Sequence, residues 1–135
     1  MMNKNKLLVL VAFAVLAAAA LACEFSASTA NIKDAWMASD EAGQVRTDVF
    51  TQDAIFYCKV DLANAPDDTT VKASWTAVEV EGEEPNVFLD ETELTGGDNN
   101  LTFQLSNSSL WPLGSYKIDL YLNDELDRTL EFEVQ

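Results

Sequence analysis

The sequence contains no histidine among its 135 residues. Imidazole is the usual general base near neutral pH, a member of Ser–His–Asp and Cys–His catalytic groups, and a common metal ligand. Its absence excludes those groups. The chain also shows no phosphate-binding glycine loop and no metal-binding motif, so we expect a protein that is not an enzyme and that needs no cofactor.

Basic residues are scarce, with 8 Lys and Arg against 23 Asp and Glu. Two of the eight, Lys4 and Lys6, lie in a stretch that we expect to be removed, and no acidic residue precedes residue 23. Residues 23–135 therefore carry a formal net charge of −17. Nucleic acid and anionic lipid headgroups repel such a surface, so we expect no nucleic-acid partner.

Long apolar runs are also lacking, apart from one near the start. Residues 7–21 are drawn only from Leu, Val, Ala and Phe, which is shorter than the about 20 residues of a membrane-spanning helix. Two lysines precede the run and small residues follow it. These are the parts of a secretory signal.

The run ends at Ala20-Leu21-Ala22-Cys23, which resembles the lipobox of bacterial lipoproteins, with Ala20 where leucine is usual. In that family a diacylglycerol is attached to the cysteine thiol, and cleavage leaves this cysteine first. The resemblance implies a helical signal peptide over residues 1–22, lipid attachment at Cys23 and a short tether over residues 23–30. It also implies an exported protein held on the membrane by its N-terminal lipid, at the cell surface or in the periplasm. A plain signal peptide and an uncleaved anchor are the alternatives.

Downstream of the tether, no sustained helical pattern occurs. Short runs of alternating apolar residues are separated by turn residues, and they predict strands at 32–38, 54–62, 71–78, 87–94, 101–105, 116–122 and 130–134. Seven such strands indicate one all-β domain over residues 31–135, an antiparallel sandwich. The partly acidic run 87–94 is expected at a sheet edge.

Four residues narrow the type of sandwich. Cys58 lies on the inward face of the second expected strand, Trp75 on that of the third, and Tyr116 stands two residues before Ile118 on the sixth. This pattern resembles the core of an immunoglobulin domain. The resemblance implies that Ile118 stands in the place of the second cysteine and that Tyr116 is a tyrosine corner bonded to upstream backbone.

The chain is also similar to uncharacterised small bacterial lipoproteins with a single immunoglobulin-like domain, over residues 50–62, 67–75 and 111–122. That resemblance implies a fold and an anchor, and no activity. With Cys23 lipidated, Cys58 has no partner in its own chain. Burial and intermolecular pairing are then the alternatives, and its inward position favours burial.

Two further kinds of site are weighed against simpler interpretations. Calcium takes six to eight oxygen ligands, and three acidic turns offer some: Asp67, Asp68 and Thr69; Asp98, Asn99 and Asn100; and Asn123, Asp124, Glu125 and Asp127. Solvated turn residues are the alternative. Trp36 is a candidate for stacking on a sugar ring, with packing as the favoured alternative, whereas packing explains Trp75 and Trp111.

The sequence therefore predicts a non-enzymatic module for protein interaction or structure at the cell envelope, anchored by lipid and contacting a protein partner. A glycan- or calcium-binding module of the same fold is the alternative.

Overall fold

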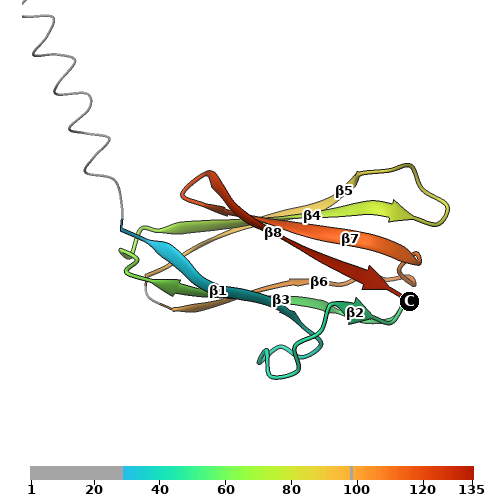
Figure 1. The fold of residues 1–135 in the computed structure, drawn as a ribbon, viewed down its shortest axis with the longest axis horizontal. Helices are drawn as coiled ribbons and strands as arrows, with labels where there is room; N and C mark the ends of the chain where they lie inside the picture. The colour runs from blue at the N-terminus through green and yellow to red at the C-terminus, as the bar shows by residue number, and fades with distance from the viewer. Residues whose placement is uncertain (1–28, 98) are drawn as a thin grey trace, which may run out of the picture.

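The computed structural model describes residues 29–97 and 99–135. The expected signal peptide, Cys23 and most of the expected tether lie outside the described residues. The described part is all-β, with eight strands and no helix (Figure 1). The strands are β1 (Asn31–Ala38), β2 (Val49–Phe50), β3 (Phe56–Ala63), β4 (Thr70–Val80), β5 (Val87–Thr95), β6 (Asn100–Leu105), β7 (Gly114–Leu122) and β8 (Glu125–Val134).

The strands form two sheets that face each other (Figure 1). The three-stranded sheet has the order β1-β3-β6, and the five-stranded sheet has the order β2-β8-β7-β4-β5. All seven expected strands are present, and β5 lies at an edge as expected. Among the residues described, no helix is long and apolar enough to cross a membrane.

The strand that the sequence did not predict is β2. It has only two residues, too few to show an alternating pattern, and it pairs in parallel with β8, Val49 opposite Glu133 and Phe50 opposite Val134. The expected count of seven strands, all antiparallel, is therefore corrected to eight with one parallel pair. Because β1 belongs to the other sheet, residues 39–48 carry the chain from one sheet to the other.

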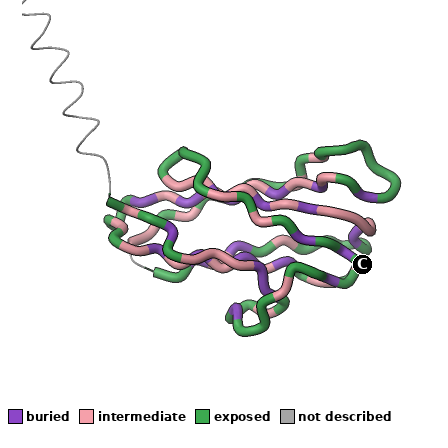
Figure 2. Tube along the Cα trace, in the orientation of Figure 1, coloured by how far each residue is buried: buried purple, intermediate pink, exposed green. Residues whose placement is uncertain are grey.

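The alternating pattern places the core between the sheets. Every second residue of β3 and β4 is buried, from Phe56 to Leu62 and from Val71 to Ala77. In Figure 2 the buried positions alternate with exposed or half-buried ones along the strands. Phe56 is completely buried, and its ring lies within 6.3 Å of five other aromatic rings, those of Phe50, Trp75, Trp111, Tyr116 and Phe132.

The turn between β7 and β8 has only two residues. Asn123 and Asp124 have positive φ angles of 48° and 69°, as the central residues of a type I′ hairpin turn require. Glu125 already belongs to β8, and the backbone N–H of Thr70 donates to Oδ1 of Asn123 at 3.0 Å. Residues 123–124 therefore form a two-residue turn that is tied to the start of β4.

The connections divide between the two ends of the sandwich. We call the end where residues 29–30 lead into β1 the entry end; the turns at 64–69 and 123–124 lie there. The opposite end, called the far end, holds residues 51–55, 81–86, 106–113 and Gln135 (Figure 1).

Candidate functional site

The acidic turns gather at the entry end, but they do not converge on a cation site. Among the described residues there is no group of three or more Asp, Glu, Cys or His side chains that could hold a metal ion. Asp67 and Asp68 are exposed, and Oδ1 of Asn99 accepts the backbone N–H of Asn100. Asp127 pairs with Arg128 at 2.7 Å. Asp98, of the second expected cluster, lies outside the described residues.

Trp36 lies on the outer face of the three-stranded sheet, where another side chain covers it. The guanidinium of Arg46 lies 4.0 Å from the centre of its ring, and its indole N–H donates to the carbonyl of Gly43 at 2.9 Å. A sugar ring that stacked on the covered face would have to displace the cation–π contact, which contributes about 0.5–1 kcal/mol at exposed sites. Trp36 is thus an anchor for the connection between β1 and β2.

That connection is fastened to the sheet at several points. Gly43 is buried with φ of +75°, and a Cβ added there would lie 2.5 Å from Cγ of Lys59. Nζ of Lys59 donates to the carbonyl of Glu41 at 3.2 Å. The carboxylate of Asp40 accepts the backbone N–H groups of Val45 and Gln44, and these bonds hold the pKa of Asp40 below its usual value. Residues 39–47 form an ordered cover over this face.

Cys58 is completely buried between the sheets and is a free cysteine. Burial disfavours the thiolate and raises the pKa of its thiol from 9.0 to about 12. Because the thiolate is the reactive form, the native protein should resist alkylation by iodoacetamide at pH 8 and react once guanidinium unfolds it. Intact mass after timed quenching measures this, and rapid modification in native buffer would contradict the position assigned to Cys58.

The far end is closed by aromatic side chains from the segment 106–113 and β7. The hydroxyl of Tyr116 donates to the carbonyl of Pro112 at 2.5 Å, which is the contact implied for a tyrosine corner. The indole of Trp111 donates to the carbonyl of Ala54 at 2.8 Å and stacks on Phe56 with ring centres 4.5 Å apart. Trp75 lies directly opposite Ile118 in the β4–β7 pair, and both are buried. These residues build the core and leave no reactive group exposed.

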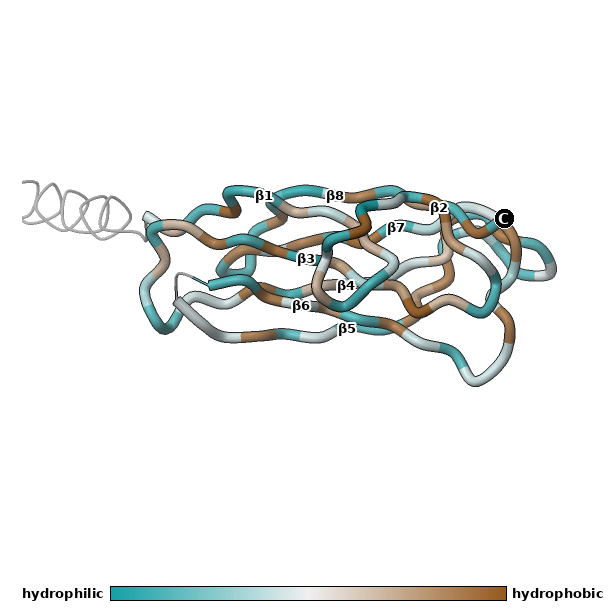
Figure 3. Tube along the Cα trace, turned by 90° about the horizontal axis from the view of Figure 1, so that it is seen from below, coloured by the Kyte–Doolittle hydropathy of each residue, from teal (hydrophilic) through white to brown (hydrophobic). Residues whose placement is uncertain are grey.

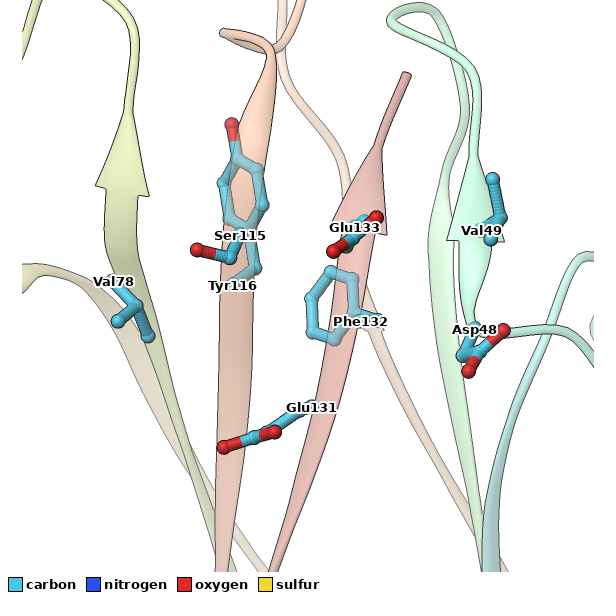
Figure 4. A pocket seen from close by; sticks show the side chains of 8 residues that line it. All are labelled: Asp48, Val49, Val78, Ser115, Tyr116, Glu131, Phe132 and Glu133. Carbon is cyan, nitrogen blue, oxygen red and sulfur yellow. The ribbon is translucent and has the colours of Figure 1, made fainter.

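Among the hollows on the described part of the molecule, two bear on function, and neither was predicted from the sequence. The first, of about 410 Å³, lies over β7 and β8 and extends from Val78 to Val49. Figure 4 shows the carboxylates of Asp48, Glu131 and Glu133 around it, and no basic residue lines it. Its acidic lining disfavours anionic ligands.

The second hollow, of about 210 Å³, lies at the far end and is mostly apolar. We call it the far-end pocket; Val87 and Leu89 of β5 line it together with Trp111, Pro112 and Tyr116. Its lining comes from segments far apart in sequence. The local signal is limited to Val87 and Leu89, two half-buried apolar residues in a mostly exposed strand.

No protein-family model matches the sequence, and no curated protein matches it. Among solved structures, an immunoglobulin-like protein from Pseudomonas aeruginosa is similar with a TM-score of 0.50 and 14% identity over 82% of this chain and 99% of that one. Alkylpurine DNA glycosylase AlkC of Pseudomonas fluorescens, bound to DNA containing an abasic site analog, is similar with a TM-score of 0.51 and 15% identity over 80% of this chain and 31% of that one.

A β-glucosidase from Listeria innocua is similar with a TM-score of 0.48 and 13% identity, over 79% of this chain and 16% of that one. The chain thus spans less than a third of the DNA glycosylase structure and less than a fifth of the β-glucosidase structure. At 14% identity the likeness to the immunoglobulin-like protein concerns the fold alone, and it supports an immunoglobulin-like sandwich.

Proposed function

We propose that this protein is a lipid-anchored lipoprotein of the cell envelope whose immunoglobulin-like domain contacts a protein partner through its far end. The observation that carries the proposal is the distribution of exposed apolar side chains. Of the six large ones in the described part of the chain, four lie at or beside the far end: Val49, Ile55, Phe88 and Leu110. Single exposed apolar residues are ordinary, whereas their concentration opposite the point of chain entry favours a contact surface.

The proposed lipid anchor is consistent with a contact surface at the far end, because the anchor lies at the opposite end of the domain. With lipid on Cys23, the tether spans at most about 25 Å when extended, so the entry end is the one nearest the bilayer. Asp67, Asp68 and Asp124 lie at that end, and anionic headgroups repel them. The domain would stand off the membrane on its tether with the far end directed outward.

The experiment has one arm for the anchor and one for the contact surface. Cys23→Ser should move the protein from the detergent phase to the aqueous phase or leave the precursor uncleaved, as measured by phase partition and intact mass. For the surface, a photo-crosslinking residue replaces Leu110 at the far end or, as the control, Leu126 beside the entry-end hairpin. The two positions are similarly exposed, 63% and 57%.

We expect a discrete crosslinked protein from position 110 and none from position 126. Equal crosslinking from both positions, or none from either, would contradict the proposed contact surface. An unmodified mature protein in the aqueous phase would contradict the anchor.

The glycan- or calcium-binding alternative has a separate test. A ligand that binds only the folded protein raises the midpoint of thermal unfolding. We expect no rise with millimolar calcium or with soluble cell-wall glycan fragments, and a rise would favour the alternative.

A further inference from the structure

Strand β5 leaves a long edge of the five-stranded sheet without a partner. Its nine residues pair only with β4 among the strands described, and β6 belongs to the other sheet. Figure 3 shows β5 along the lower margin of the molecule with no strand beyond it. Proteins commonly protect such edges with charged side chains, bulges, proline or very short strands. Residues 87–95 contain no proline, and their charged side chains are all acidic, so together with a bulge at Leu89 they protect this edge against acidic strands but not against basic ones.

The two faces of this edge differ in chemistry. Glu91 lies opposite Ser74 and Glu93 opposite Lys72, both at positions on the outer face of the sheet. The other face carries Leu94, Thr92 and Asp90, which lie opposite the buried residues Val71, Ala73 and Trp75 of β4. A strand added beside β5 would therefore meet the carboxylates of Glu91 and Glu93 on the outer face, and a mixed set of side chains, Asp90, Thr92 and Leu94, on the inner face.

The far-end pocket adjoins the free edge of β5. Val87 and Leu89 belong to β5 and also line the pocket, with Trp111 and Tyr116 at its back. An apolar cavity of about 150 Å³ is large enough to bind benzene, so the 210 Å³ here accommodate one aromatic or branched side chain. Glu83 adds a carboxylate to the lining.

We propose that the free edge of β5 binds an extended, basic segment of a partner protein by strand addition, with one apolar side chain of that segment in the far-end pocket. In this mode main-chain hydrogen bonds supply affinity and pockets for alternate side chains supply specificity. The inference rests on the proposed function, because it assigns the chemistry of the partner that the far end contacts.

The negative charge of the β5 edge indicates which kind of segment would bind there. A second copy of this chain would place like charges from Glu91 and Glu93 across the new strand pair, which is destabilising. A segment that alternates basic and apolar residues would place its positive charges opposite these carboxylates, and such complementarity guides association. The acidic edge thus disfavours self-association and favours a basic strand.

The probe is a blocked nine-residue peptide of alternating lysine and valine with a central phenylalanine, labelled and titrated by fluorescence anisotropy against the detergent-solubilised full-length protein. The double variant Glu91→Lys/Glu93→Lys should weaken binding by about tenfold or more, because two charge contacts become repulsive. The matched control, Glu131→Lys/Glu133→Lys on β8, changes the net charge equally and should alter the affinity less than about twofold.

A second probe tests the backbone bonds without altering the protein. The same peptide, N-methylated at alternate residues, keeps its charges and loses the N–H groups that would face β5. We expect its binding to fall by about tenfold or more, since strand addition depends on those donors. Equal weakening by both double variants, undiminished binding of the N-methylated peptide, or no binding to the native protein would each overturn the proposal.

Failure of this inference is distinguishable from failure of the proposed function. Crosslinks from position 110 that persist in the Glu91→Lys/Glu93→Lys variant would leave the far-end contact intact and exclude the β5 edge. Edge-specific peptide binding without any crosslink from position 110 would support the edge and contradict the far-end contact.

Discussion

Replacing Trp75 with alanine is expected to lower the free energy of unfolding by about 3–5 kcal/mol, the cost of deleting a large buried aromatic side chain. The indole is 1% exposed at the middle of β4, and its ring lies 6.3 Å from that of Phe56 and 6.0 Å from that of Phe132. Both neighbours would border the resulting cavity. Since a whole domain is stable by about 5–15 kcal/mol, this single change threatens folding.

Two milder variants calibrate the measurement, which is denaturant titration followed by circular dichroism. Tyr116→Phe keeps the packed ring and leaves the Pro112 carbonyl without its donor, so the loss should be about 1–2 kcal/mol. Phe88→Ala removes an aromatic side chain that is 61% exposed, and it should change stability by about 0.5 kcal/mol or less. A Trp75→Ala protein as stable as the Phe88→Ala protein would mean that β4 does not face the core.

Replacing Gly114 with alanine is expected to cost about 3 kcal/mol or more, through backbone strain of about 1–3 kcal/mol and overpacking of similar size. Gly114 opens β7 with φ of +142°, and a Cβ there would lie 2.2 Å from the carbonyl oxygen of Glu79 and 2.7 Å from Cα of Val80. The bulge in β4 between Ala77 and Glu79 brings this backbone close. Because the obstacle is backbone rather than a flexible side chain, the strand pair itself must move.

Gly82 supplies the control, since it also has a positive φ, +80°, but a Cβ there meets nothing within 4 Å. Gly82→Ala should therefore cost only about 1 kcal/mol, from the strained φ alone. Thermal unfolding of both variants separates the close approach from the backbone conformation. Equal midpoints would show that β7 does not pass against the β4 bulge.

The sequence predicted the core because a strand with one buried face carries its own register. A shift of one residue would turn Cys58, Val60 and Leu62 outward together, so the alternation alone fixes which side chains meet. The edge position of β5 was also predictable from the pattern of its side chains. Its carboxylates must stay exposed to solvent, and a strand at the edge of a sheet allows this. The resemblance to an immunoglobulin core agrees with the fold that the structure shows.

The features that the sequence did not predict depend on contacts between distant residues. β2 exists because Val49 and Phe50 meet the last residues of β8, about 80 positions later. The cover over the three-stranded sheet requires Trp36, Lys59 and Arg46 to meet around Gly43. The far-end pocket likewise joins β5 to the segment that carries Trp111. Local periodicity contains no information on such pairings.

The start of β1 and the end of β8 lie at opposite ends of the sandwich, and this arrangement has a mechanical consequence. Residue 31 begins β1 at the entry end, and residue 134 ends β8 at the far end. A pulling force between these points therefore acts along the strands. Hydrogen bonds in the antiparallel β1–β3 ladder run across that direction, so they bear the load in shear and together, rather than opening one after another. A domain built in this way resists extension between its two ends more strongly than a sandwich whose loaded strands peel apart.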